Sequence, residues 1–167
     1  MLVIADSSPL NVLINTDHID ILPRLFGTVI IPPEVSRELM DDKRPQAVRT
    51  FIARAPTWLI EQAPASLEPI PMLHPGEAAA ISLALEVHAD LLLIDEIDGR
   101  RAAAARGIHV AGTIGVIEQA ADRGLLDLKE AFTAIKKTDF WISHELLDAR
   151  LKLHVDRKGA LKKPTDD

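Results

Sequence analysis

The sequence predicts an α/β fold with a parallel sheet of about four or five strands, and three observations support this prediction. Short runs of valine, isoleucine and leucine alternate with longer segments that have the period of a helix. Prolines stand where three of these helical segments begin, a position at which proline costs no backbone hydrogen bond. The 167 residues, 47% of them hydrophobic, are enough for one domain with its own core.

The expected elements follow one another in a regular order. Strands are expected at residues 2–5, 28–31, 91–94 and 108–110, with a weaker fifth run at 57–62. Helices are expected at residues 9–15, 19–25, 33–40, 45–54, 75–88, 99–105 and 114–123. Residues 63–75 contain four prolines, so this segment is expected to be an exposed connection rather than a domain boundary.

The C-terminal part is expected to be helical, without a further strand. This gives a main domain at residues 1–128, a helical extension of the same domain at 129–155, and a polar, flexible tail at 156–167. The helices carry large apolar side chains that we expect to pack on the domain or at a dimer seam, the alternative being an apolar stripe for a partner. These side chains are Phe132, Phe140, Trp141, Leu146, Leu147 and Leu151.

Composition excludes several classes of protein. A net charge of −6 and an isoelectric point near 5.5 argue against a generic, strongly basic nucleic-acid binder, so any such contact must be local. The absence of cysteine excludes disulfides and thiolate metal sites and suits a reducing cytoplasm. No signal peptide and no run of about 20 apolar residues is present, so we expect a soluble cytoplasmic protein.

Two aspartates stand where predicted strands end. Asp6 closes the run in "LVIADSSPL", and Asp95 follows the strand in "LLLIDEIDGRR". In open parallel sheets ligands bind outside the carboxyl ends of the strands, where the strand order reverses. If the two strands are neighbours, the carboxylates lie side by side and repel each other unless a cation, most obviously a divalent metal, compensates.

Three further acids fit the same edge of the sheet. Glu38 and Glu77 lie on helices that follow strand ends, and Asp98 comes three residues after Asp95. Carboxylate oxygens are the ligands that Mg²⁺ and Mn²⁺ prefer, and no cysteine or closely spaced histidine set competes for zinc. Each acid also has a structural interpretation: Asp6 as a helix cap, Glu77 as a partner of the helix dipole, and Glu38 and Asp98 as solvated surface charges.

Other functional patterns are missing or scattered. No dinucleotide-binding, P-loop or nucleophile-elbow motif occurs, and the six histidines are spread along the chain. Of these, only His74 is near the predicted site. Arg100, Arg101 and Arg106 follow the Asp95 loop and could hold phosphates, or form an ordinary solvated helix face.

Three segments of the chain resemble the PIN-domain family. They are "VIADSSPLNVLI", "VIIPPEVSREL" and "HPGEAAAISLALEVHADLLLIDEIDGRRAAAARGIHVAGTIGVI", and the last is similar to an uncharacterised branch with a GEAxAI-type helix. The resemblance runs from about residue 2 to 128. It implies a three-layer α/β/α metal-dependent nuclease fold, often the toxin of a toxin–antitoxin pair that cleaves RNA, and commonly a dimer.

The family's acidic positions fall on residues of this chain. Its first acid falls on Asp6, its second on Glu38 and its third, more commonly aspartate, on Glu77. The fourth falls on Asp95 or Asp98, where the family often has asparagine and then aspartate and this chain has aspartate at both. The resemblance thus implies Mg²⁺ or Mn²⁺ as cofactor, an RNA substrate, an antitoxin protein as partner and a homodimer.

Three functions of different classes follow. The first is a metal-dependent endoribonuclease whose five acids hold one or two metal ions that activate water and stabilise the leaving oxygen. The second is a catalytically weak module of the same fold that binds protein or RNA partners. The third is a phosphate-transfer receiver domain, against which stands the missing lysine after the last strand in "IHVAG".

Overall fold

The computed structural model describes residues 1–162, and its centre is a parallel sheet. Five strands pair in the order β3-β2-β1-β4-β5. Their bounds are β1 Val3–Ala5, β2 Val29–Ile31, β3 Leu59–Glu61, β4 Leu91–Leu93 and β5 Val110–Ala111. The weaker run at 57–62 is therefore a true strand, and it lies at one edge of the sheet.

Strand β1 is the centre of the sheet and pairs with β2 on one side and β4 on the other. Val3 is in register with both Val29 and Leu91. The chain builds β2 and β3 outward on one side of β1 and then returns to build β4 and β5 on the other. The strand order therefore reverses between β1 and β4, where such sheets bind ligands.

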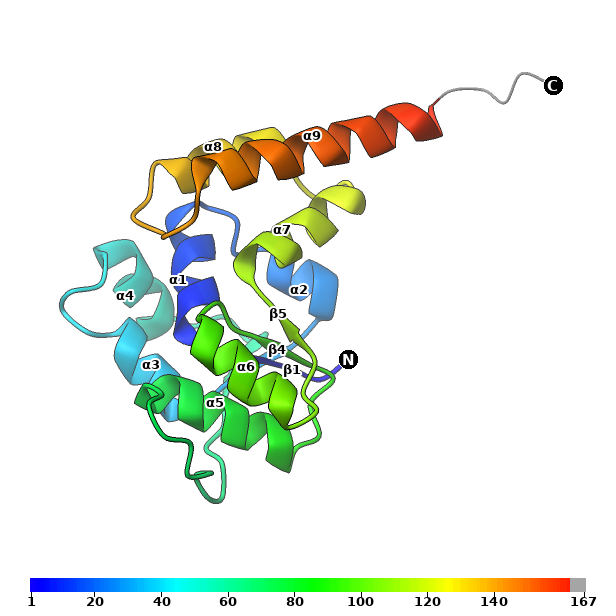
Figure 1. Ribbon diagram of the computed structural model, residues 1–167. Helices are drawn as coiled ribbons and strands as arrows, with labels where there is room; N and C mark the ends of the chain where they lie inside the picture. Colours follow the sequence, from blue (N-terminus) through cyan, green and yellow to red (C-terminus); the bar gives the residue numbers. More distant parts are fainter. Residues whose placement is uncertain (163–167) are drawn as a thin grey trace.

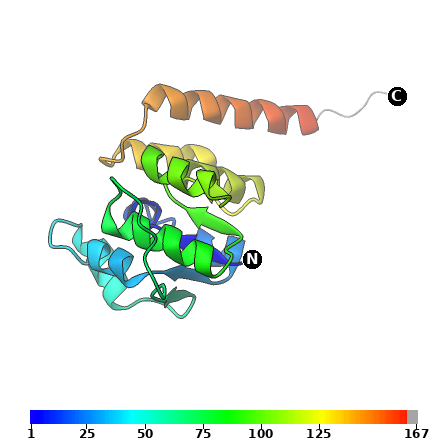
Figure 2. The same cartoon turned by 60° about the horizontal axis from the view of Figure 1, so that its bottom comes forward.

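Helices cover both faces of the sheet, which gives three layers (Figures 1 and 2). Helices α5 and α6 pack on Ile4, Ile30 and Leu92, while α1, α2 and α7 pack on the opposite face. The helices are α1 Ser7–Asn15, α2 Ile21–Phe26, α3 Pro33–Leu39, α4 Gln46–Ala53, α5 Pro75–Glu86, α6 Ile97–Ala105, α7 Thr113–Asp122, α8 Leu128–Lys136 and α9 His144–Leu161.

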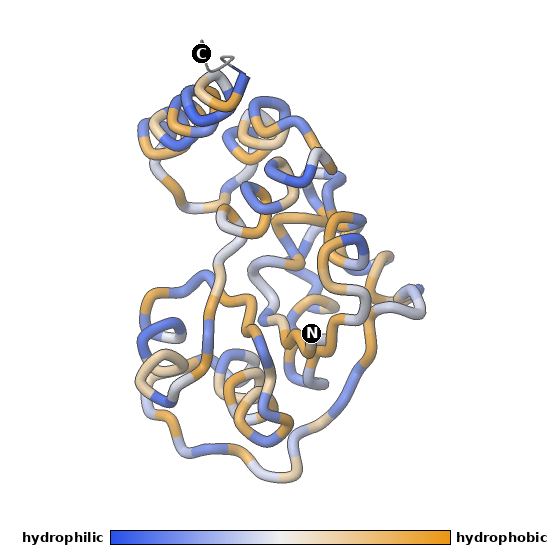
Figure 3. The backbone as a smooth tube through the Cα atoms, turned by 90° about the vertical axis from the view of Figure 1, so that its right-hand side faces the viewer, coloured by the Kyte–Doolittle hydropathy of each residue, from blue (hydrophilic) through white to orange (hydrophobic). Residues whose placement is uncertain are grey.

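The C-terminal helices form an outer layer beyond α7. Phe132 of α8 and Leu147 of α9 are buried and belong to the same core cluster as β1, so this part extends the core of the domain. The far end of α9 projects past the body in Figures 1 and 2. Its outer turns mix polar and apolar residues along the tube in Figure 3, and Leu153 and Leu161 are exposed.

The C-terminal part differs from expectation at its tail. A polar, flexible tail was expected from residue 156, whereas helix α9 continues to Leu161; residues 156–161 contain no proline, so each backbone amide can donate within the helix. Residues 163–167 of the predicted tail lie outside the described part. Trp141 was expected to pack on the domain or at a dimer seam; within this chain its side chain is 99% exposed, whereas Phe132 and Leu147 are buried as expected. In residues 1–162, no helix has the length and apolar character needed to cross a membrane.

Candidate active site at the carboxyl end of the sheet

Asp6 lies at the point where β1 passes into α1. Its backbone amide still donates to Leu93 O at 2.8 Å, which holds it beside the end of β4. It occupies the cap position of α1, yet its side chain forms no capping hydrogen bond and is only 2% exposed. Its Oδ1 has no hydrogen-bond partner among residues 1–162. A helix cap would use this side chain to accept a hydrogen bond from the first turn of α1, and no such bond is present. Burying a carboxylate oxygen without a partner is also costly, so helix capping does not account for Asp6.

Glu38 reaches the same region from the last turn of α3. Its Oε2 accepts a hydrogen bond from Ser7 Oγ at 2.9 Å, and its Oε1 accepts one from Gly76 N at 2.8 Å. A Cβ at position 76 would lie 2.5 Å from both carboxylate oxygens, so glycine is what lets the carboxylate approach helix α5 so closely. Glu38 is therefore held by specific contacts and is not a free surface charge.

Glu77 lies in the first turn of α5 and is buried, with 5% of its surface exposed. Its Oε2 lies against Gly99 of α6, 3.4 Å from where a Cβ would stand. A glutamate can complement the helix dipole from an exposed position, so that effect by itself does not explain why Glu77 is buried. The burial of Glu77 thus favours a role inside the pocket.

Asp95 follows β4 and is held by three hydrogen bonds. Thr113 donates its backbone N–H to Oδ1 and its hydroxyl to Oδ2, both at 2.7 Å, and Ser8 Oγ donates to Oδ2 at 2.9 Å. The Arg100 guanidinium packs over Gly112 beside this carboxylate and donates to Ile94 O at 3.3 Å. Asp95 therefore ties the ends of three segments together, namely those after β1, β4 and β5.

The four acids influence one another electrostatically. The pKa of Asp6 is raised from its ordinary 3.8 to about 7, mainly because burial removes water from the carboxylate. The Ser7 amide opposes this rise, and the negative charges of Glu38, Glu77 and Asp95 add to it. Burial also raises the pKa of Glu77, an effect that nearby His74 opposes. Without a cation, it is unfavourable for all four of these carboxylates to be ionised at the same time.

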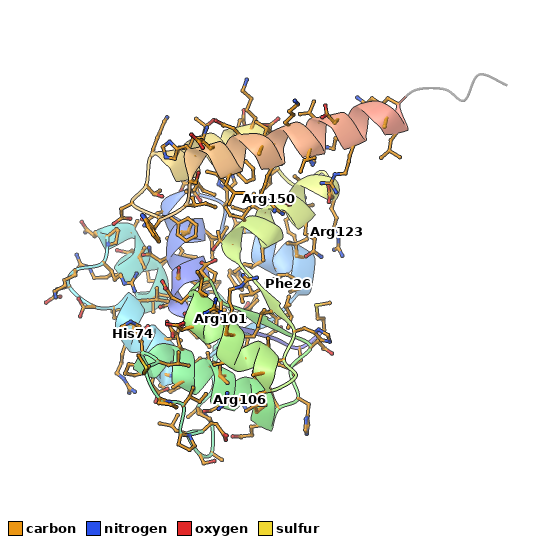
Figure 4. The ribbon with its side chains drawn as sticks, viewed as in Figure 1. Phe26, His74, Arg101, Arg106, Arg123 and Arg150 are labelled. Atoms are coloured by element: carbon orange, nitrogen blue, oxygen red, sulfur yellow. The ribbon has the colours of Figure 1, made fainter. Side chains whose placement is uncertain are left out.

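Two adjoining hollows are lined by these side chains. Asp6, Glu38 and Glu77 line a pocket of about 470 Å³, which we call the acidic pocket. Asp95 and Asp98 line a larger hollow of about 910 Å³, which we call the groove. Ser8, Arg44 and Glu96 line both, so the two are continuous. In Figure 4 His74, another pocket residue, lies at the start of α5, and Arg150, a groove residue, lies between α7 and α9.

The five predicted acids are therefore not equivalent. Asp6, Glu38 and Glu77 share the acidic pocket, and Asp95 is close enough to raise the pKa of Asp6. Asp98 is exposed and faces the groove. In the sequence Asp95 and Asp98 were equal candidates for the fourth acid. In the structure Asp95 precedes α6 and raises the pKa of Asp6, whereas Asp98 is an exposed residue in the first turn of α6.

The donor chemistry of the pocket fits a hard divalent cation. Oxygen ligands are present, and the unpartnered Oδ1 of Asp6 is the orphaned atom that a cation would satisfy. However, no group of three or more histidine, aspartate or glutamate side chains in residues 1–162 is arranged to hold a metal ion as it stands. The reason is that Glu38 and Asp95 are turned toward their hydroxyl and amide donors, so they surround the pocket without converging.

The three predicted arginines separate on helix α6. Arg100 lies in the groove beside Asp95, which agrees with a phosphate contact. Arg101 is exposed on the outer face of α6 (Figure 4). Arg106 donates to Ala102 O at 3.0 Å and lies 4.0 Å from Glu68, so it belongs to the solvated face away from the site.

Sequence reasoning missed several residues of the site. Ser7, Ser8 and Thr113 hold the acids, and Glu96 lines both hollows. The two serines directly after Asp6 were the available signal, because hydroxyls that follow a strand end stand at the same edge of the sheet. Thr113 and Arg44 gave no comparable signal.

Parallel strands between two helical layers, with acids at the switch point, define a PIN-like α/β/α protein. The DUF3368 family model, described as a PIN domain, matches residues 2–156, and the chain belongs to the PIN-domain family. PIN domains are commonly metal-dependent nucleases and generally use Mg²⁺ or Mn²⁺. Comparisons with curated proteins and with solved structures gave no match.

Proposed function

We propose that this protein is a metal-dependent endoribonuclease that hydrolyses RNA phosphodiester bonds at the acidic pocket. One observation carries the proposal: the buried Asp6 carboxylate, with an unpartnered oxygen, is surrounded by three further acids whose charges raise its pKa. Membership of the PIN-domain family supports a nuclease-like fold. A set of acids that repel one another destabilises the fold, so its presence favours a function that needs them.

In this proposal Asp6, Glu38, Glu77 and Asp95 hold Mg²⁺ or Mn²⁺, and Asp98 stays a predicted contributor from the groove side. The metal supplies Lewis acidity and lowers the pKa of water. Ser7 and Gly76 orient Glu38, while Thr113 and Ser8 orient Asp95. Arg100 is placed to contact a substrate phosphate.

A catalytically weak binding module is the second candidate. The observation that favours it is that the acids do not converge on a metal position without rearrangement. The two candidates differ in an enzymatic assay, because only the first requires turnover.

The decisive test is cleavage of single-stranded RNA by purified protein in Mg²⁺ or Mn²⁺. Addition of EDTA, which chelates the metal, should stop the cleavage. Asp95→Asn should lower the rate by orders of magnitude while far-UV circular dichroism shows a folded chain, because the amide removes charge at the site. Asp156→Asn, at an exposed position of α9 outside both hollows, is the matched control and should keep the native rate. Full activity of Asp95→Asn, or no metal-dependent cleavage by the native protein, contradicts the proposal.

We further propose a cytoplasmic homodimer that acts as the toxin of a toxin–antitoxin pair. The support is the family, whose members often work with RNA and antitoxins, and the exposed apolar residues on the outer part of α9. We also propose that α8 and α9 work as one unit with the α/β domain, because they share its core.

A further inference from the structure

We propose that the groove is a track for single-stranded nucleic acid and that Trp141 is the platform on which a base stacks. The inference rests on the proposed nuclease function and names a binding residue for its substrate. Trp141 lies in the connection between α8 and α9, outside the acidic pocket. Its role would be to hold a nucleotide beside the one that is cleaved.

The first support is the continuity of the groove with the acidic pocket. Ser8, Arg44 and Glu96 line both hollows, and from there the groove continues to Trp141, Leu146 and Arg150. A strand bound with one phosphate at the pocket would therefore extend along the groove. The pocket of about 470 Å³ opens into a groove of about 910 Å³, so more than one nucleotide can be accommodated.

The second support is the way in which Trp141 is held outward. Phe140 and Ile142, its two neighbours, pack against the core, whereas the Trp141 side chain is 99% exposed. The loop is fixed by hydrogen bonds on both sides: Phe140 N donates to Thr138 Oγ1 at 3.2 Å, and Ile142 N donates to Phe140 O at 3.0 Å. An indole held outward by an ordered loop is a stacking surface that needs little ordering on binding.

The third support is the position of positive charge in an acidic chain. Arg44, Arg100 and Arg150 line the groove, and the first two form no ion pair with other residues in the range 1–162. Arg150 forms an ion pair with Glu118, with Nη2 donating to Oε2 at 2.8 Å, so among residues 1–162 the unpaired positive charge of the groove comes from Arg44 and Arg100. The acids of the groove are Asp95, Glu96, Asp98 and Asp139. The first three lie at the end where the proposed metal would offset their charge.

An arrangement of phosphate-binding cations and an aromatic face along one groove is how proteins bind single strands. Base stacking tolerates any base, so the groove is expected to select single strands over duplexes rather than a sequence. A duplex keeps its bases stacked inside and cannot offer one to Trp141.

The test uses fluorescently labelled ten-nucleotide oligouridylate and oligoadenylate in Mg²⁺, with all proteins carrying Asp95→Asn so that cleavage is slowed while metal can still offset the acids. Trp141→Ala should weaken binding by about 5- to 150-fold, the usual range for loss of one stacked base. Trp141→Phe should restore most of the affinity. Arg44→Gln should lower the slope of log affinity against log salt by about 0.7, as for one phosphate of a single strand.

A second readout separates stacking from a structural role. The chain has two tryptophans, and the other, Trp58, packs beside Phe51 with ring centres 6.2 Å apart. In a Trp58→Phe background, Trp141 is the sole emitter, and its fluorescence should be quenched by oligonucleotide. In Mn²⁺, Trp141→Ala should raise KM more than it lowers kcat.

The outcomes distinguish the two proposals. Metal-dependent cleavage with equal affinity and KM in Trp141→Ala overturns the stacking role and leaves the nuclease intact. Binding and quenching without any cleavage removes the nuclease and keeps the track. Protection of Trp141 from acrylamide before RNA is added, increasing with protein concentration, overturns the inference in favour of a second copy of the chain as the occupant.

Discussion

Replacement of Asp6 by asparagine should stabilise the metal-free protein, and the size of the effect should depend on pH. The side chain is buried and its Oδ1 has no partner, so the isosteric amide loses no observed hydrogen bond of that atom. Burial raises the pKa from 3.8 to about 7. A shift of about three pKa units at ~1.36 kcal/mol each lowers the free energy of unfolding by at most about 4 kcal/mol when Asp6 is ionised.

The direction follows from which state holds the proton. Below pH 3.8 Asp6 is protonated in both the folded and the unfolded chain, so it contributes no difference. Between pH 3.8 and about 7 the unfolded chain releases the proton while the folded chain keeps it, which favours unfolding increasingly. Above about pH 7 the penalty is constant. Asp6→Asn carries no such penalty at any pH.

The assay is urea unfolding in EDTA, followed by circular dichroism. The gain in unfolding free energy of Asp6→Asn over the native protein should rise from about 1 to 2 kcal/mol at pH 5 to about 4 kcal/mol at pH 8. Asp98→Asn, at an exposed site, should change stability by no more than about 0.5 kcal/mol. A variant that is less stable at pH 8, or a gain that does not change with pH, refutes the reasoning.

Metal should reduce the stability advantage of Asp6→Asn over the native protein. An ion that binds only the folded chain adds about 2.7 kcal/mol at 100 times its dissociation constant. The native protein should gain this in millimolar Mg²⁺ or Mn²⁺, and Asp6→Asn should gain little. An equal gain in both proteins would place the ion elsewhere.

Two further predictions concern Glu38 and the oligomeric state. Gly76→Ala places a Cβ 2.5 Å from both Glu38 carboxylate oxygens, so the flexible side chain must swing away and the metal-induced rise in Tm should fall; Gly159→Ala, with nothing within 4 Å, is the control and should keep the full rise. The protein should also elute as a dimer of twice 18.3 kDa in size-exclusion chromatography with light scattering, and a monomer at all concentrations would contradict the homodimer.

The sheet and its first acid could be predicted because their signals are local. An apolar run such as residues 2–5 must be buried whatever surrounds it, and the polar residue that ends it must lie at the sheet edge. The same reasoning found β3 and put Asp6 and Asp95 after strand ends; that these two strands are neighbours was left as a condition, which the pairing of β1 with β4 fulfils. The helical nature of α8 and α9 was equally readable from their period.

The tertiary structure alone decided how the acids are held and which of them meet. The hydrogen bonds from Ser7 to Glu38 and from Ser8 to Asp95 join residues 31 and 87 positions apart, and no local pattern encodes such a pairing. Asp98 lies in the first turn of α6 and lines the groove but not the acidic pocket, and its spacing from Asp95 in the sequence does not reveal this. Trp141 is exposed, whereas its neighbours Phe140 and Ile142 are partly buried against the core. From hydrophobicity one can predict only that such residues tend to be buried. The space available in the packed core determines which of them are buried.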